Sequence, residues 1–174
     1  MKYVLPILLI IVFACKNEEA NMIVNNPNWT PDTSSDMNAQ FSIEESAEID
    51  LFLSTHPDWK MTKTGTGLQY MIYYKSESQD SAKIGDLVTV NFEISLLSGE
   101  VCYSSADKGA ENFIVEKSDI ESGLHQGIQF LCVGDKAKFI IPSHSAHGLI
   151  GDTDKIPPLS TVVYDIELVG IGEE

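Results

Sequence analysis

The chain has 174 residues and a formal net charge of −15, from 26 acidic and 11 basic side chains. Every basic residue is a lysine, so the chain has no guanidinium group for bidentate contacts with phosphate. The acidic surface repels nucleic acids and anionic lipid headgroups, and we expect neither to bind by charge. The length is enough for one domain with a hydrophobic core and a short extension.

Residues 1–15 resemble the signal sequence of a bacterial lipoprotein. One lysine precedes the apolar run from Val4 to Phe13, which is shorter than the roughly 20 residues that span a bilayer. The run ends at Ala14-Cys15, and a small residue before cysteine predicts cleavage there and acylation of Cys15. The alternative is a secreted protein that is cleaved nearby. The expected location is the cell envelope, with the lipid as the membrane anchor.

Residues 16–40 are rich in Asn, Asp, Ser, Thr and Pro, which predicts a disordered acidic tether. Residues 41–82 are predicted to form a helix and a hairpin that extend the main domain. Ser42 and Glu45 have the spacing of a capping box, so a helix is expected from Ser42 to Leu53. Its apolar side would carry Ile43, Ala47 and Leu51. Packing is the expected role of this helix, dimerisation is the alternative, and the expected state is a monomer.

Alternating apolar residues predict the strands that follow. The first two form a hairpin within Trp59–Lys75, which turns at Gly65-Thr66-Gly67. The others are expected at Leu87–Leu97, Glu100–Ser104, Asn112–Val115, Lys136–Ile141 and Thr161–Leu168. Between them, Asp119 is expected to cap a short helix with an apolar stripe of Ile120, Leu124, Ile128 and Leu131. Five or six antiparallel strands with one short helix indicate an α+β domain over residues 83–172.

The segment Ile156-Pro157-Pro158 lies directly before the last strand, where Val162, Tyr164 and Ile166 alternate onto one face. Two prolines preset the turn and delay the start of the strand. This segment, together with Gly123, Gly127, Gly134, Pro142 and Gly148, resembles the FK506-binding-protein family of peptidyl-prolyl isomerases. The resemblance covers Lys83 to Ile171 and implies a strongly twisted sheet wrapped on the short helix.

The resemblance also implies an apolar pocket for proline. Its expected lining is Phe92, Tyr103, Ile120, Glu121, Leu124, His147, Ile156 and Tyr164, with Cys102 and Glu111 at the rim. Phe92 keeps the ring but loses the hydroxyl of the family's tyrosine, and Leu124 replaces a larger aromatic floor. His147 replaces a tyrosine that meets a substrate carbonyl, and the backbone N–H of Glu121 is expected to contact the ligand.

These departures predict a weak isomerase or, as the alternative, a peptide- or partner-binding module without turnover. A structural lipoprotein with no ligand site is a third hypothesis. Isomerisation needs an apolar cup that favours the twisted amide, so we expect no cofactor and no metal. His125, His144 and His147 follow no recognised metal-ligand motif. The implied fold separates Cys102 from Cys132, so free thiols are expected, although the compartment allows a disulfide.

The expected partners are proline-containing polypeptides, together with the membrane through the lipid. The order of signal, acidic tether and divergent isomerase domain is similar to that of gliding-motility-associated lipoproteins of the Bacteroidetes. This similarity implies a folding helper at the envelope that supports gliding and an envelope protein complex as a further partner.

Overall fold

The computed structural model describes residues 31–172. Phe41–Glu174 form one compact unit, and the described residues before Phe41 belong to a second unit. The predicted signal sequence, the lipidation site Cys15 and residues 16–30 of the predicted tether lie outside the described residues. Within the described part, no helix is both long and apolar enough to cross a bilayer.

Helix α1 (Pro31–Ser54) begins well before the predicted Ser42. The prediction of a disordered tether is therefore wrong for Pro31–Gln40. Proline suits the first helical position, because its fixed φ is helical and the N–H it lacks would have no partner there. Ser42 lies inside the helix, where its carbonyl oxygen accepts the Ser46 hydroxyl at 2.8 Å. The predicted capping box therefore does not mark the start of the helix.

The buried side of α1 is not the predicted one. Ile43 and Leu51 are 71% and 69% exposed, and Ala47 is exposed as well. The buried residue is Ile49, which forms a small cluster with Ile140 and Val163 of the sheet. Phe52, Leu53, Trp59, Met61 and Leu97 pack around this cluster. The second half of α1 thus packs on the sheet through Ile49, which was not among the predicted apolar residues.

Within the described residues, seven antiparallel strands form one sheet, made of the predicted strands of the main domain and the two strands of the predicted hairpin extension. They are β1 (Thr62–Lys63), β2 (Gln69–Tyr74), β3 (Leu87–Leu96), β4 (Val101–Ser104), β5 (Glu111–Ile114), β6 (Lys136–Ile141) and β7 (Val162–Gly172). The order is β1-β2-β6-β7-β3-β4, and β5 pairs with β3. Because β2 pairs with β6, the predicted hairpin extension belongs to the same sheet as the main domain.

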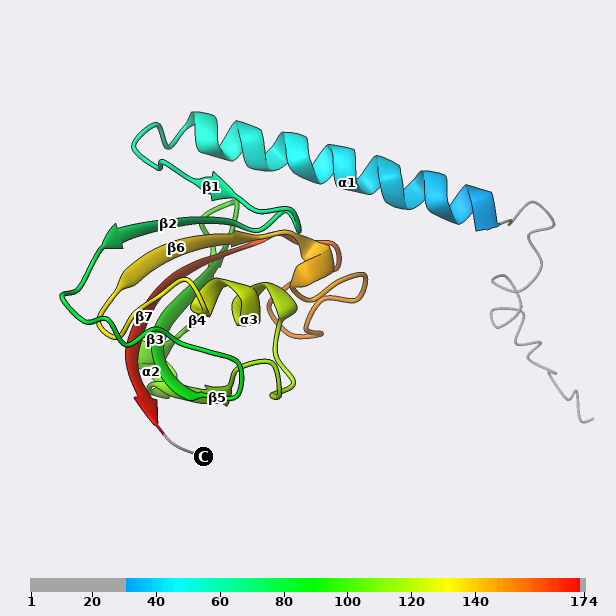
Figure 1. The fold of residues 1–174 in the computed structure, drawn as a ribbon. Helices are drawn as coiled ribbons and strands as arrows, with labels where there is room; N and C mark the ends of the chain where they lie inside the picture. Colours follow the sequence, from blue (N-terminus) through cyan, green and yellow to red (C-terminus); the bar gives the residue numbers. More distant parts are fainter. Residues whose placement is uncertain (1–30, 173–174) are drawn as a thin grey trace, which may run out of the picture. The chain divides into compact units, whose positions relative to one another are not determined.

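The sheet curves around helix α3 (Ser122–Ile128), which lies in its hollow (Figure 1). Phe139 and Ile141 of β6 point to this side, opposite to Ile140 between them. Any Cβ at Gly123 would clash with Ile141, and one at Gly127 would clash with Phe139. Two glycines on one side of α3 therefore allow the helix to lie directly against β6.

The predicted position of the short helix is right, but its predicted cap is wrong. Glu121, not Asp119, occupies the N-cap position, and its side chain makes no capping hydrogen bond. The carboxylate of Glu121 is therefore free to point elsewhere. A further short helix that was not predicted, α2 (Ser105–Lys108), begins where the Ser104 hydroxyl accepts the Ala106 N–H. The 3-10 turn η1 (Ser143–Ser145) follows β6. Cys102 and Cys132 are free thiols, as predicted.

Candidate functional site

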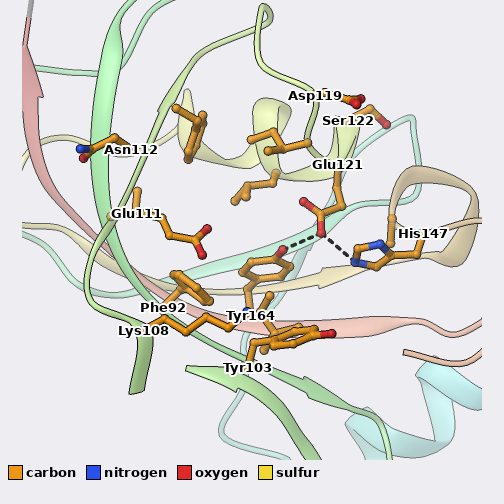
Figure 2. Close-up of a pocket in the computed structure, with 16 residues that line it drawn as sticks. Phe92, Tyr103, Lys108, Glu111, Asn112, Asp119, Glu121, Ser122, His147 and Tyr164 are labelled. Atoms are coloured by element: carbon orange, nitrogen blue, oxygen red, sulfur yellow. Dashed lines mark hydrogen bonds and ion pairs between the residues drawn. The ribbon is translucent and has the colours of Figure 1, made fainter. Parts of the chain in front are cut away.

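A cavity of about 450 Å³ lies between α3, the hollow side of the sheet and the loop after η1 (Figure 2). Strands β3, β4, β5 and β7 supply half of the residues that line it. The lining consists of Val90, Phe92, Ile94, Tyr103, Lys108, Glu111, Asn112, Phe113, Asp119, Ile120, Glu121, Ser122, Leu124, Ala146, His147 and Tyr164. Its size is within the range of roughly 300–1,000 Å³ that is typical of ligand pockets.

The apolar wall follows from strand periodicity. Val90, Phe92 and Ile94 are alternate residues of β3 and so face the same side. Ile94 is paired with Tyr164 of β7, which places the Tyr164 ring beside them. Leu124 of α3 contributes to the wall from the helix side. The result is a hydrophobic surface of aromatic and aliphatic side chains, which suits an apolar ring.

The carboxylate of Glu121 lies beside this apolar wall and contacts two other lining residues. Glu121 Oε1 accepts the Tyr164 hydroxyl at 2.9 Å and lies 2.8 Å from His147 Nε2 (Figure 2). The Glu121 side chain is only 10% exposed. The three residues come from the N-cap of α3, from β7 and from the loop after η1, so the contact joins all three elements at the pocket.

The environment of Tyr164 keeps its hydroxyl protonated. Burial raises the pKa of Tyr164 well above its usual value, and the nearby Glu121 carboxylate raises it further. The neutral hydroxyl can therefore donate a hydrogen bond to Glu121 at any physiological pH.

Tyr103 of β4 also lines the cavity, and its side chain does not close it. Its hydroxyl donates to Asp152 and lies 3.3 Å from Asp154, and the Lys108 ammonium lies 4.1 Å from the centre of its ring. The hydrogen bond to Asp152 and, after it, burial raise the pKa of Tyr103. Asp152 in turn accepts the Ile156 N–H at 2.7 Å. Tyr103 is thus held against the loop, and the cavity stays open.

Most of the predicted site residues meet at this cavity. The lining includes Phe92, Tyr103, Glu111, Ile120, Glu121, Leu124, His147 and Tyr164. Two of the predicted residues lie outside this cavity. Ile156 is 2% exposed and lies in the main hydrophobic core, because the loop turns its side chain inward. Cys102 is equally buried in that core, with its Sγ 3.7 Å from the Lys155 carbonyl oxygen, and neither residue lines the cavity.

Sequence reasoning missed part of the lining. Val90 and Ile94 lie two residues from Phe92, so the alternation of β3 could have identified them. Phe113 could have been found in the same way, from its place in a predicted strand. Lys108 ends α2 and Asp119 lies in a bend before α3, and these polar residues outside the strands carried no such signal. Among the described residues, no group of three or more His, Cys, Asp or Glu side chains is arranged to hold a metal ion.

Comparison with known proteins agrees with this architecture. Residues 78–169 match the model of the FKBP-type peptidyl-prolyl cis-trans isomerase family. FK506-binding protein 2 of Dictyostelium discoideum is 35% identical over 112 residues, which cover 63% of this chain and 84% of that protein. A probable FKBP-type isomerase FkpA of Neisseria meningitidis is 41% identical over 110 residues, or 63% of this chain and 39% of that protein.

Solved structures show the same fold. FkpA from Escherichia coli superposes with a TM-score of 0.66 at 25% identity, covering 80% of this chain and 64% of that one. The structure of AtFKBP13 gives a TM-score of 0.60 at 25% identity and is covered completely, by 66% of this chain. The predicted enzyme class, a peptidyl-prolyl cis-trans isomerase, is confirmed by these relatives. With more than half of its length matched by the family model, the chain belongs to the FKBP-type peptidyl-prolyl cis-trans isomerase family.

Proposed function

We propose that the cavity between α3 and the sheet binds proline and its preceding amide in protein chains and accelerates their cis-trans exchange. The observation that carries this proposal is the open cavity walled by Phe92, Leu124 and Tyr164 on the family's fold. These three side chains are 8%, 6% and 2% exposed. They are therefore held rigidly by the surrounding core.

The chemistry follows from the amide bond. Conjugation gives the peptide bond a rotation barrier of about 20 kcal/mol, and the conjugation is lost when the amide twists. An apolar cup that strips water from the amide and fits the twisted form better than either planar form lowers that barrier. No nucleophile or proton transfer is required, so the apolar part of the lining, with Phe92, Ile94 and Leu124, is sufficient for this chemistry.

NMR exchange spectroscopy on short Xaa-Pro peptides with the purified full chain tests the proposal. The uncatalysed exchange takes tens of seconds or more. We expect faster exchange with the chain present and a return to the uncatalysed rate with Tyr164→Ala, provided that the variant is still folded by circular dichroism. Uncatalysed rates with the folded parent protein would disprove the isomerase proposal.

A peptide-binding module without turnover is the second candidate. The buried carboxylate of Glu121 in the pocket wall favours it, because a fixed charge interrupts the apolar contact with proline. The same NMR experiment separates the two candidates. Broadened or shifted proline resonances without faster exchange would indicate binding alone.

We also propose that the chain is a lipoprotein of the cell envelope, acylated at Cys15. The apolar run that ends at Ala14-Cys15 supports this location. Metabolic labelling with a radioactive fatty acid would label the parent chain and not Cys15→Ala. A function in gliding is the finer proposal, supported by the order of signal, acidic segment and isomerase domain. Deletion of the gene should then reduce colony spreading, and the Tyr164→Ala variant should fail to restore it.

A further inference from the structure

Two carboxylates point into the pocket. Figure 2 shows Glu111 and Glu121 reaching toward the space that the lining encloses, Glu111 from β5 and Glu121 from the start of α3. Oε1 of Glu121 meets both Tyr164 and His147. Neither residue uses Oε2, which leaves one oxygen of a carboxylate that is nine-tenths buried available to an occupant of the pocket.

The charges around the cavity do not balance. Apart from two tyrosines, its ionisable lining consists of the carboxylates of Glu111, Asp119 and Glu121, the ammonium of Lys108 and the imidazole of His147. Lys108 lies over the Tyr103 ring, 4.1 Å from its centre. Three carboxylates against one ammonium leave the cavity negative. A low-dielectric wall strengthens the field that these charges exert inside it.

Binding of an uncharged peptide would desolvate Glu121 without replacing the lost water. When an apolar residue beside proline covers Glu121, the carboxylate loses water and gains no partner, which is unfavourable. A lysine ammonium or an arginine guanidinium in the same place would replace that water with a charge-assisted hydrogen bond. The pocket therefore distinguishes peptides by the charge that flanks the proline.

We propose that the pocket selects prolines flanked by lysine or arginine, with Glu121 as the main specificity-determining residue and Glu111 as its support. This inference rests on the proposed function, because it names the substrate class of the same site. A purely structural role of Glu121, holding Tyr164 and His147 in place, makes a different prediction. Glutamine can still accept the Tyr164 hydroxyl, so Glu121→Gln keeps that role and removes only the charge.

The test compares peptides that differ only in charge. Ala-Xaa-Pro-Ala and Ala-Pro-Xaa-Ala would be measured with Xaa as lysine, norleucine or glutamate, and with arginine against citrulline. Exchange rates come from NMR exchange spectroscopy, and dissociation constants come from chemical-shift titration of the full chain. In the parent protein at low salt, we expect lysine to exceed norleucine by at least about fivefold in one of the two series, with glutamate below both. The lysine preference should shrink at about 300 mM salt.

Variants assign the preference to the pocket. Glu121→Gln should bring lysine and norleucine close to parity, and Glu111→Gln should reduce their difference in part. Glu93→Gln is the matched control, because Glu93 is exposed on β3 between Phe92 and Ile94 and faces away from the cavity. It removes the same charge from a position outside the cavity and should leave the preference intact.

The outcomes separate the two proposals. If no peptide exchanges faster, the proposed isomerase function fails, and the charge preference is then decided by the dissociation constants. Equal rates and equal affinities for lysine and norleucine at low salt would overturn the inference. A preference that survives in full in both Glu121→Gln and Glu111→Gln would overturn it as well, because the charge would then act from outside the pocket.

Discussion

Leu124 is the residue whose size sets how much of a proline ring the pocket can cover. It is 6% exposed and lines the cavity from α3. An indole in its place would add apolar contact, and about 50 Å² of it is worth about 1 kcal/mol, or roughly fivefold in affinity. We therefore expect Leu124→Trp to bind proline peptides more tightly and to accelerate their exchange, measured by shift titration and exchange spectroscopy.

The matched control for this prediction is Leu149→Trp. Leu149 is 67% exposed and does not line the cavity, so the same indole there should change neither affinity nor rate. Thermal melts of both variants would show whether the added volume strains the fold. A folded Leu124→Trp variant with no gain in affinity or exchange rate would mean that the size of Leu124 does not limit proline binding.

His125 is a buried residue whose tautomer the fold dictates. Its Nδ1 accepts the Glu116 N–H at 3.0 Å, and its Nε2 lies 2.9 Å from the Ser118 carbonyl oxygen. A nitrogen that accepts carries no hydrogen, so the other must donate, which requires the neutral Nε2–H form. Long-range ¹H–¹⁵N spectra at neutral pH should show this tautomer for His125 and averaged nitrogen shifts for an exposed histidine. An Nδ1–H signal from His125 would contradict the contact.

At the scale of elements, Glu45 fastens α1 to the loops at the end of the sheet. Its Oε1 accepts the Ser143 N–H at 2.6 Å and the Thr161 hydroxyl at 2.7 Å. A hydrogen bond to a charged group contributes about 1.5–3 kcal/mol. Glu45→Ala should therefore lower the free energy of unfolding by about 2 kcal/mol and speed amide exchange in the second half of α1.

Glu48→Ala is the control for that prediction. Glu48 lies on the exposed side of the same helix, and its replacement keeps the change in helix propensity the same. Urea unfolding should leave its stability within about 0.5 kcal/mol of the parent. Equal losses in both variants would mean that Glu45 acts through the helix itself and not through its contacts.

The strands were predictable from the sequence, whereas only the second half of α1 was, and its buried side was not. The alternation of Val88, Val90 and Phe92 survives because β3 has one face in the core, so burial enforces period two. For α1, the prediction relied on Ser42 and Glu45 as a local capping signal. Tertiary contacts determine the buried side instead. Glu45 accepts a hydrogen bond from Ser143, and Ile49 packs with Ile140, and both partners lie more than ninety residues away along the chain.

The strand residues of the pocket were predictable from alternation, whereas its loop residues Ile120 and His147 were predictable only from the family pattern. Phe92 and Tyr164 follow from strand alternation and the family pattern. Ile156 lies in a loop, where the sequence has no period that says which way a side chain points, and it packs into the core. The contact of Glu121 with Tyr164 and His147 joins three separate segments, so no spacing along the chain predicts it.

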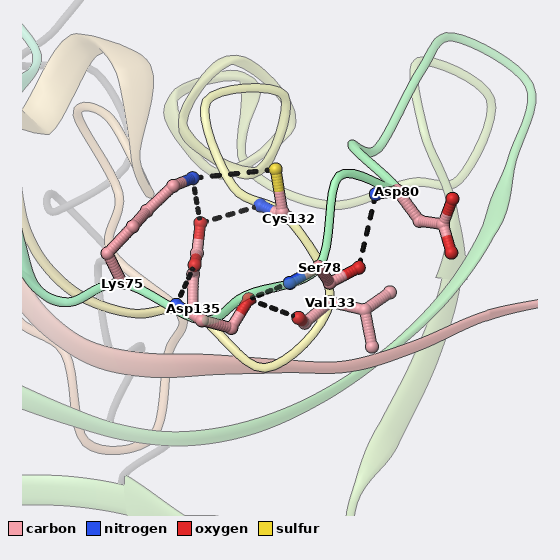
Figure 3. Close-up of polar contacts among 7 residues, drawn as sticks. Lys75, Ser78, Asp80, Cys132, Val133 and Asp135 are labelled. Carbon is pink, nitrogen blue, oxygen red and sulfur yellow. Dashed lines mark hydrogen bonds and ion pairs between the residues drawn. The ribbon is translucent and has the colours of Figure 1, made fainter.

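At the scale of the whole molecule, Asp135 ties together the ends of distant segments. Its side chain has no exposed surface, and it accepts hydrogen bonds from the Ser76 N–H and the Cys132 N–H at 2.8 Å each. The Lys75 ammonium is 2.6 Å away (Figure 3). Burial opposes ionisation of Asp135, but Lys75 and the two N–H groups outweigh it and lower its pKa.

Asp152 is similar: burial opposes ionisation, yet the Tyr103 hydroxyl and backbone N–H groups lower its pKa to about 2.

These two depressed pKa values predict loss of stability in acid. An aspartate in the unfolded chain has a pKa near 3.9, so the stabilisation is fully present above about pH 4 and disappears as the pH falls through the lower folded values. The free energy of unfolding, measured with urea, should therefore fall between about pH 4 and pH 2. Asp135→Asn and Asp152→Asn should be less stable at pH 7 and less sensitive to acid, because the amide does not titrate and places an NH₂ group against N–H donors. The exposed Glu93→Gln should keep the parent slope, and if all three variants keep it, other carboxylates control the acid response.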